Sequence, residues 1–402
     1  MMERRKNLND KFGFVEIMEY TSIGESCSVV SGGTPSRSKN EYWENGNIPW
    51  IKIGNIKSKY VNEYDELITE QGLNNSSAKL LKKGTILYTI FATLGEVGIL
   101  DIEACTNQAI AGINITDPRI TTDYLYYYLK SKKDYVNNIG RGVAQNNINL
   151  TTLKNFEIPL IDVDKQLNIV EILEKVERMI CLKEKEIDDL DLLIKARFIE
   201  MFGDPIVNEK GWRTKPLLDM GQCKNGMNFH YDDKGIDINC LGVCDFKNFS
   251  VIDNTKVLPT VSLNEMPSEE YLLKDDDIVF VRSNGNKALV GRSLVVYPGN
   301  VPTTFSGFCI RYRKYDNEII VPYLLRVLKT DSVRMKMSGR GANIQNLNQQ
   351  ILGTLVIPVP PIELQEQFAD FVQQVDKSRE EVKKSLEKTQ QLYDSLMQEY
   401  FG

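Results

Sequence analysis

The sequence predicts an α+β protein with two repeated globular domains and two long helices that pair as an antiparallel coiled coil. Three observations lead to this fold class. The second half of the 402-residue chain repeats the first, short β-branched segments alternate with turn residues at the front of each half, and an uninterrupted amphipathic run closes each half.

The repeat appears when the chain is shifted by 199 residues. Gly140-Arg141-Gly142 then falls on Gly339-Arg340-Gly341, and Gln166 falls on Gln365. Between positions 124 and 203, 19 of 80 pairs are identical without a gap. The front parts match only with gaps, so their loops differ in length. A shared scaffold with divergent loops predicts two different binding specificities.

The repeat and the two amphipathic runs divide the chain into five parts. We expect an N-terminal segment, a first globular domain, a central long helix, a second globular domain and a C-terminal long helix, with boundaries at 1–19, 20–160, 161–203, 204–361 and 362–402.

The front of each half has the composition of a small, twisted, mostly antiparallel sheet. Segments rich in β-branched and aromatic residues predict strands, and Gly, Asn and Ser between them predict turns. We expect strands within 48–54, 84–90 and 96–100 in the first half and 277–281 and 293–297 in the second, and a helix at 122–133.

Two runs without Gly or Pro, 164–202 and 363–401, predict helices of about 38 residues, each ~57 Å long. Their apolar residues alternate at spacings of four and three, with Lys183 and Arg379 among the exceptions, which is typical of a coiled-coil seam. One small sheet cannot cover a seam of this length, so pairing is favoured over packing of each helix on its own sheet. The residues expected at the pairing surface are Ile169, Leu173, Val176, Ile180, Ile187, Leu190, Ile194, Phe368, Val372, Val375, Val382, Leu386, Tyr393 and Leu396.

Composition excludes several classes of protein. The chain is 42% hydrophobic, too apolar for a disordered protein, yet no run reaches the ~18 uncharged apolar residues of a membrane span. The polar start predicts no secretory signal, and seven scattered cysteines favour a reducing, cytoplasmic location. A single histidine excludes a multi-histidine metal site.

Cys223, His230, Cys240 and Cys244 could be read as a zinc site. Their spacing is not that of a standard zinc knuckle, and the first half has no counterpart. We therefore expect no metal and interpret these cysteines as buried or incidental.

Charge is uneven along a chain whose net charge is −6. Residues 311–340 carry eight bases and three acids, and residues 124–141 carry four bases and one acid, at matching places in the repeat. The pattern predicts a positive face on each domain, suited to phosphate contact, with ordinary solvated side chains as the alternative.

The order of these motifs resembles that of a known family. Each half has a Gly-Arg-Gly, an Asn-x-Asn, an Ile-Pro, a Gln and a long helix, and the first half opens with Ser31-Gly32-Gly33-Thr34-Pro35 and Ile48-Pro49-Trp50-Ile51. From about residue 20 to 402 the chain resembles the specificity subunit of type I restriction-modification enzymes. The second half departs from this pattern, because Asn225-Gly226-Met227-Asn228 replaces the Gly-Gly-Thr-Pro.

The resemblance implies that each globular unit is a target recognition domain that reads one half of a split, asymmetric double-stranded DNA site. It implies that the paired helices act as a ruler and dock two methyltransferase subunits, which methylate adenine at N6. S-adenosylmethionine is then bound by those partners and no cofactor by this chain. Motor-nuclease subunits complete the restriction enzyme, and no membrane is involved.

The residues agree with a non-catalytic role. The sequence contains no Asn-Pro-Pro-Tyr or Asp-Pro-Pro-Tyr of amino-methyltransferases and no P-loop. A coiled-coil scaffold that binds only proteins is the main alternative. A catalytic enzyme using Asp, Glu or Cys is the other, although no residue is nominated for it.

Candidate DNA contacts are polar and basic residues on loops. The loop 282–287, which follows a predicted strand, and its counterpart 89–95 are the first candidates. The Gly-Arg-Gly segments with their Asn and Gln residues fit a phosphate clamp or, equally, a joint between sheet and helix. The expected contacts are Thr34, Thr89, Thr93, Lys130, Arg141, Gln145, Asn146, Arg282, Ser283, Asn284, Asn286, Lys287, Arg340, Asn343 and Gln345.

Overall fold

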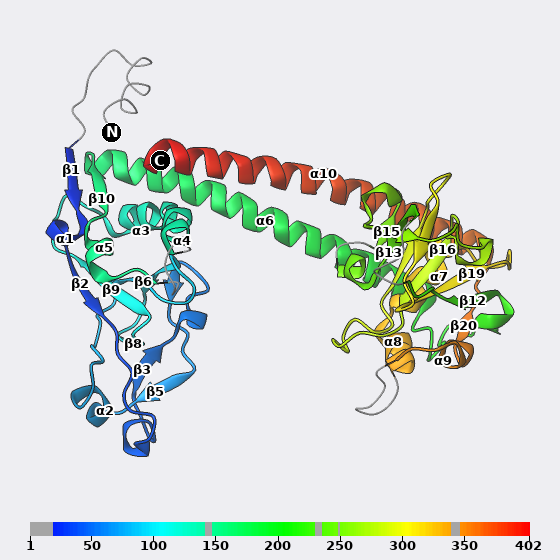
Figure 1. The fold of residues 1–402 in the computed structure, drawn as a ribbon, viewed down its shortest axis with the longest axis horizontal. Helices are drawn as coiled ribbons and strands as arrows, with labels where there is room; N and C mark the ends of the chain where they lie inside the picture. The colour runs from blue at the N-terminus through cyan, green and yellow to red at the C-terminus, as the bar shows by residue number, and fades with distance from the viewer. Residues whose placement is uncertain (1–18, 141–146, 230–234, 248–249, 339–345) are drawn as a thin grey trace, which may run out of the picture. The chain divides into compact units, whose positions relative to one another are not determined.

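The computed structural model describes residues 19–140, 147–229, 235–247, 250–338 and 346–402 (Figure 1). The chain folds as two compact units. Unit 1 contains Met1–Glu184 and Lys384–Gly402, and unit 2 contains Lys185–Lys383. Each unit therefore combines one globular domain with half of each long helix. The boundaries expected from the sequence follow the ends of the helices, whereas the units divide both helices near their middle.

Unit 1 contains three small sheets. The five-stranded sheet has the order β2 (Cys27–Ser31), β9 (Ile110–Ile115), β6 (Ile86–Thr89), β7 (Val97–Leu100) and β4 (Tyr60–Val61). The three-stranded sheet has the order β5 (Glu66–Ile68), β3 (Ile48–Ile51) and β8 (Cys105–Thr106), and β1 (Glu19–Ser22) pairs with β10 (Glu157–Leu160). Among the described strands of unit 1, β4–β7 and β3–β8 are the parallel pairs. The short helices are α1 (Ile23–Ser26), α2 (Glu70–Asn74), α3 (Thr122–Ser131), α4 (Lys133–Gly140) and α5 (Leu150–Lys154).

Unit 2 repeats this topology strand for strand. Its five-stranded sheet has the order β12 (Gly221–Asn225), β19 (Cys309–Lys314), β16 (Asp277–Val281), β17 (Ser293–Val296) and β14 (Val251–Ile252). Its smaller sheets are β15 (Thr260–Leu263), β13 (Ile236–Leu241) and β18 (Thr303–Phe305), and the pair β11 (Thr214–Pro216) and β20 (Val356–Pro358). The helices α7 (Val321–Lys329), α8 (Asp331–Ser338) and α9 (Gln349–Gly353) correspond to α3, α4 and α5.

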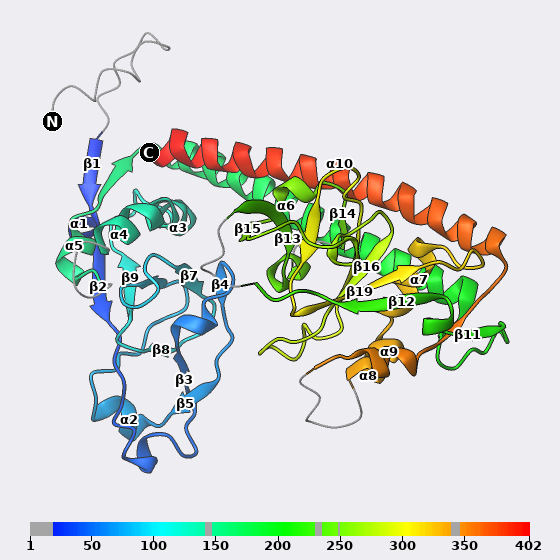
Figure 2. The same ribbon diagram turned by 45° about the vertical axis from the view of Figure 1, so that its right-hand side comes forward.

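The predicted strands and the predicted helix at 122–133 are confirmed. Figure 2 shows that, in unit 1, the three-stranded sheet and α2 lie at the end of the unit remote from the last turns of α10 (Ile362–Phe401). The buried core instead fills the space between the five-stranded sheet, α3 and the long helices, with α3 burying every residue from Tyr124 to Leu129.

The two long helices, α6 (Val163–Phe202) and α10, are uninterrupted and pair antiparallel, as predicted. In unit 1, the Tyr393 hydroxyl donates to Glu177 and Lys183 Nζ donates to Ser385 Oγ at 2.8 Å. In unit 2, Arg379 pairs with Asp191. All the residues expected at the pairing surface are buried or half-buried. No helix in the described part of the chain is both long and apolar enough to cross a membrane.

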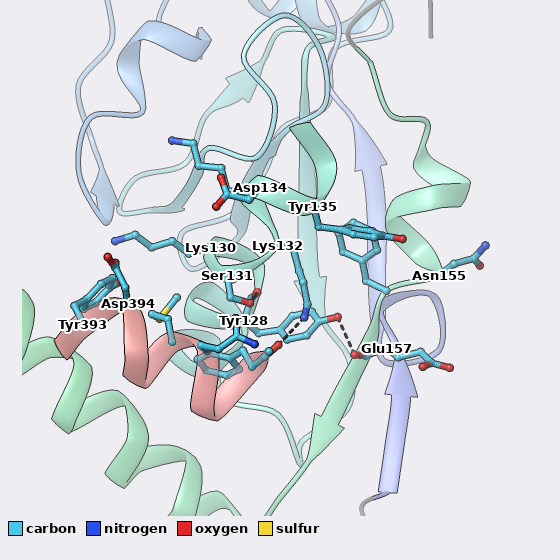
Figure 3. Close-up of a pocket in the computed structure, with 16 residues that line it drawn as sticks. Tyr128, Lys130, Ser131, Lys132, Asp134, Tyr135, Asn155, Glu157, Tyr393 and Asp394 are labelled. Atoms are coloured by element: carbon cyan, nitrogen blue, oxygen red, sulfur yellow. Dashed lines mark hydrogen bonds between the residues drawn. The ribbon is translucent and has the colours of Figure 1, made fainter. Parts of the chain in front are cut away.

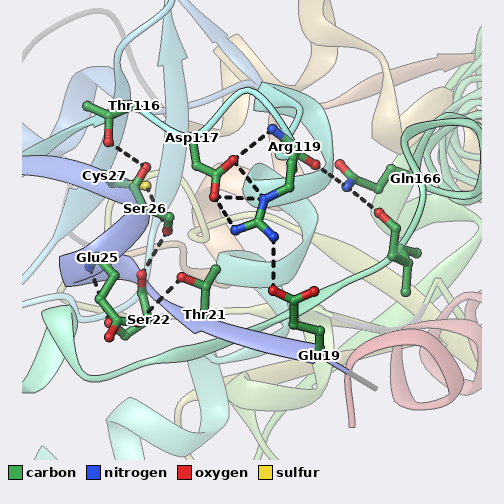
Figure 4. Close-up of polar contacts among 11 residues, drawn as sticks. Glu19, Thr21, Ser22, Glu25, Ser26, Cys27, Thr116, Asp117, Arg119 and Gln166 are labelled. Carbon is green, nitrogen blue, oxygen red and sulfur yellow. Dashed lines mark hydrogen bonds and ion pairs between the residues drawn. The ribbon is translucent and has the colours of Figure 1, made fainter. Parts of the chain in front are cut away.

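A buried glutamine joins α6 to the globular domain of unit 1 (Figure 4). Gln166 Oε1 accepts from Thr121 N at 2.9 Å, and its Nε2 donates to Arg119 O at 2.7 Å and Ile161 O at 2.9 Å. In unit 2, Gln365 at the start of α10 makes the same three kinds of bond, to Ile320 N, Glu318 O and Pro360 O. Both side chains are fully buried, so the repeated Gln is a structural joint.

Each globular domain also packs against the end of the long helix that belongs to the other half of the repeat. The Phe401 ring of α10 lies 5.3 Å from that of Tyr124 in unit 1, and Phe202 of α6 lies 4.8 Å from Tyr323 in unit 2. The hydroxyls of these tyrosines donate to Pro159 O and Pro358 O, which fixes α3 and α7 to the strands β10 and β20. The two units are therefore built on one plan.

Candidate nucleic-acid interface

Three loops meet at one edge of each five-stranded sheet. β2 and β6 are both antiparallel to β9, so the ends of β2 and β6 and the start of β9 lie at the same edge. We call residues 31–36, 90–95 and 106–109 loop edge 1. Their counterparts in unit 2, residues 225–229, 282–288 and 306–308, form loop edge 2.

Backbone hydrogen bonds hold loop edge 1 together. Gly33 N donates to Thr106 O at 2.8 Å, and Ile90 N donates to Ala109 O at 2.8 Å. A side chain at Gly32 would bring its Cβ within 2.1 Å of Asn107 O, which explains why the first loop needs glycine. Thr34 Oγ1 donates to the exposed Gln108 side chain across the edge.

Loop edge 2 has the same backbone pattern with different side chains. Met227 N donates to Phe305 O, and Arg282 N donates to Phe308 O at 2.8 Å. A Cβ at Gly226 would lie 2.1 Å from Ser306 O, so Gly226 is the counterpart of Gly32. The segment Asn225-Gly226-Met227-Asn228, which replaces the Gly-Gly-Thr-Pro of the first half, therefore keeps the turn and changes its side chains. The Arg282 guanidinium adds a bond to Gly307 O at 3.1 Å.

Most of the predicted contacts that the structure describes lie on these two edges. Thr34 and Thr93 belong to loop edge 1. Arg282, Ser283, Asn284, Asn286 and Lys287 belong to loop edge 2, where Asn286 and Lys287 are exposed. Phe91 and Ser283 form β-bridges to Asn147 and Asn346. The predicted residues Arg141, Gln145, Asn146, Arg340, Asn343 and Gln345 lie outside the described residues.

Two of the predicted contacts, Thr89 and Lys130, lie outside the loop edges. Thr89 lies within β6 with no exposed surface, and its hydroxyl accepts a hydrogen bond from Glu96 N at 2.8 Å. Lys130 extends from α3 to Glu177 of α6, where Nζ lies 2.6 Å from Oε1, and it also lies over the Tyr393 ring. Both side chains serve the internal packing of unit 1.

Several bases of the two stretches expected to form a positive face make contacts inside their own unit. In unit 2, Arg311 is buried, Arg313 forms a bidentate ion pair with the buried Asp277, and Arg334 donates to carbonyl oxygens of the 288–290 segment. In unit 1, Lys132 donates to Phe401 O and Lys133 pairs with Glu96. Arg313, Arg334 and Lys132 therefore link segments that lie far apart in sequence.

Sequence reasoning did not select four exposed residues of the edges: Phe91, which lies within the candidate loop 89–95, and Gln108, Asn228 and Phe308. Gln108, Asn228 and Phe308 precede or follow strands that the sequence did not identify. Because Thr34 donates to Gln108 Oε1, the Gln108 amide NH₂ is suited to donate to a base edge. The signal that could have found these residues is the alignment of strand ends in the repeat.

A cavity of about 820 Å³ lies in unit 1 beside the last turns of α10 (Figure 3). Its lining includes Lys130, Lys132, Tyr128 and Tyr393. Burial lowers the pKa of Lys132, whose Nζ donates to Phe401 O at 2.7 Å, and the Tyr128 hydroxyl donates to Glu157 O. The Lys132 bond fastens the end of α10 to the domain, and the Tyr128 bond fastens α3 to β10.

Glu177 of α6 accepts hydrogen bonds from three side chains of unit 1. It accepts from the Tyr127 hydroxyl at 2.7 Å, Lys130 Nζ at 2.6 Å and the Tyr393 hydroxyl at 2.8 Å. Burial acts to raise the pKa of this carboxyl, but Lys130 and the two tyrosines outweigh it and the pKa is lowered. The charged Glu177 therefore fastens α3 and α10 to α6.

The cysteines considered for zinc binding do not form a site among the described residues. Cys240 is buried, Cys223 is half-buried and Cys244 is exposed, while His230 lies outside the described residues. Within the part of the chain that the structure describes, no three His, Cys, Asp or Glu residues are grouped as metal ligands.

Comparison with known proteins gives a match in both halves of the chain. The family model described as the type I restriction modification DNA specificity domain matches residues 16–192 and again residues 209–391. The two matches correspond to the two repeats.

Individual relatives agree with this match. The specificity subunit of the type I restriction enzyme MjaIX of Methanocaldococcus jannaschii is 31% identical over 53% of this chain and 53% of its own length, so the chain spans about half of that relative. The MjaVIII specificity subunit of the same organism is 21% identical over 94% of this chain and 92% of its own length. A solved chain from a study of complex assembly and conformational transition in the type I R-M system has a TM-score of 0.64 at 16% identity, covering 95% of this chain and 97% of that one, and shows the same fold.

Proposed function

Since the chain belongs to the type I restriction-modification DNA specificity family, we propose that it is the DNA-recognition subunit of such a complex. Each globular domain reads one half of a split, asymmetric DNA site through its loop edge. The chain supplies specificity and carries out no chemistry.

One observation carries this proposal: the two domains share a scaffold down to individual hydrogen bonds but differ at their loop edges. Gln166 and Gln365 make equivalent bonds, whereas Thr34, Phe91 and Gln108 correspond to Asn228, Ser283 and Gly307. Loop side chains with amide and hydroxyl groups are those that read base edges in the major groove. Two different edges fit two different half-sites.

The proposed partners follow from the same assignment. Two methyltransferase subunits dock on the paired helices, bring S-adenosylmethionine and methylate adenine at N6, and motor-nuclease subunits add restriction. The exposed faces of α6 and α10 support this docking, because Leu182, Leu192 and Leu392 remain exposed on helices whose seam is already paired.

Genome-wide mapping of modified bases tests the proposal. The chain is co-expressed with its methyltransferase in cells that lack adenine methylation, and a second culture expresses the methyltransferase alone. We expect N6-methyladenine in a split, asymmetric motif only when the chain is present. Methylation that is the same without the chain, or a stable complex that binds DNA without sequence preference, would contradict the proposal and favour a protein-binding scaffold.

A further inference from the structure

Each loop edge carries an exposed phenylalanine side chain. Phe91 on loop edge 1 is 41% exposed, and Phe308 on loop edge 2 is 60% exposed. Burying a phenylalanine side chain contributes about 1.5–3 kcal/mol, so leaving one in water forgoes much of that stabilisation. An aromatic residue in this place needs a reason other than stability.

The backbone beneath each ring is fixed. Phe308 O accepts from Arg282 N at 2.8 Å, Phe308 N donates to Ser306 Oγ at 3.3 Å, and a Cβ at the preceding Gly307 would lie 2.0 Å from Asn228 Oδ1. Phe91 is held by its bridge to Asn147 and is followed by Ala92 in the left-handed region, with φ of 61°. Both rings are therefore presented from rigid turns, which lowers the entropy lost when they bind.

The two rings do not occupy equivalent positions. By hydrogen-bond register, Phe308 in unit 2 corresponds to Ala109 in unit 1. Phe308 immediately precedes β19, and Ala109 immediately precedes the matching strand β9. Phe91 corresponds to Ser283, since they bridge to the matching Asn147 and Asn346. The scaffold thus accepts Ala at the position of Phe308 and Ser at the position of Phe91, and the aromatic residue is a property of the individual edge.

We propose that the Phe308 ring, and the Phe91 ring in unit 1, contact the bases of the DNA by packing against the C5-methyl group of a thymine in the half-site read by that domain. This inference rests on the proposed function. The thymine methyl is the apolar group that the major groove presents, and neighbouring Asn284 and Asn286 supply hydrogen bonds to base edges. The different positions of the two rings place the thymine contact differently in the two half-sites.

The test uses the complex of the chain with its methyltransferase and compares Phe308→Ala with Tyr315→Ala. Tyr315 is a matched control because it is 62% exposed and follows β19 at the end opposite to Phe308. After the wild-type motif has been mapped, binding is measured on its DNA and on DNA in which each thymine is replaced in turn by deoxyuridine, which lacks only the methyl group.

We expect one deoxyuridine in one half-site to weaken wild-type binding about tenfold and to leave the Phe308→Ala complex unaffected. That variant should bind the original site about tenfold more weakly and accept another base at the same position, while Tyr315→Ala behaves as wild type. Equal affinity and an unchanged motif for Phe308→Ala would overturn the inference, as would a half-site without an A·T pair. In either case the wild-type complex would still select its motif, so the proposed function would stand. Failure of the proposed function would instead appear as a wild-type complex that selects no motif.

Discussion

The joints between domain and helix are nearly identical in the two units, whereas the side chains of the two loop edges differ. At the joints, Gln166 and Gln365 make the same bonds and Tyr124 and Tyr323 anchor the same strands. At the edges, the backbone register is retained, but an exposed Phe stands where the other unit has Ala or Ser. The chain therefore keeps the residues that hold its structure apart from those proposed to recognise DNA.

The largest effect on stability is expected at the joint. Gln365→Leu and Gln166→Leu each leave two carbonyl oxygens and one amide without a buried partner, which costs about 2–4 kcal/mol. We expect the melting temperature to fall by about 5–10 °C for either variant, measured by calorimetry. Gln373→Leu, at an exposed position of α10, is the control and should change it little. Tolerance of leucine at only one joint would show that the two joints are not equivalent.

A smaller effect is expected at Glu177. Glu177→Gln removes the ion pair with Lys130 and should lower the free energy of unfolding by about 1–2 kcal/mol at pH 7. The pKa of this carboxyl is lowered in the folded protein, so its contribution is fully present above the ordinary value of 4.5 and is lost as the pH falls through the folded value. Urea unfolding at several pH values should therefore show that the difference in unfolding free energy between wild type and variant disappears in acid. The exposed Glu171→Gln on the same helix should leave stability almost unchanged at any pH.

The smallest change in stability is expected at Lys130 and Lys329, two lysines at equivalent positions of the repeat. Lys130 is paired with Glu177, whereas Lys329 in unit 2 lies near Arg326 and Arg379, and Asp376, the counterpart of Glu177, pairs with Arg379. Burial, aided by Arg326, lowers the pKa of Lys329 to about 8. We expect Lys130→Met to destabilise the protein and Lys329→Met to stabilise it by about 1 kcal/mol at pH 7.

The pH dependence of the Lys329→Met effect gives an independent check. A lysine with a lowered folded pKa destabilises the fold fully below pH 8, and this penalty fades as the pH rises from about 8 towards the ordinary value of 10.5. The advantage of the variant over wild type in urea unfolding should shrink over the same range. The exposed Lys336→Met serves as the control, and an advantage that does not change with pH would contradict the assignment.

The sequence predicted the helices, several strands and the repeat because these depend on local spacing. The absence of Gly and Pro fixes α6 and α10, and the position of Gln166 and Gln365 at the start of each helix follows from the repeat. The loop edges depend instead on which strands pair. Phe308 belongs to an edge only because β19 lies between β12 and β16, and β19 was hidden in the sequence by its alternating basic residues. Arg313 looks like a surface charge until Asp277, 36 residues away, is placed against it.

The most direct test of the account is an exchange of residues 210–360 for the corresponding domain of another family member, within the complete methyltransferase complex. The account predicts that one half of the methylated motif is replaced and the other half is retained, since the joints are shared and the edges are not. A motif in which both halves change, or neither does, would contradict the assignment of one domain to one half-site.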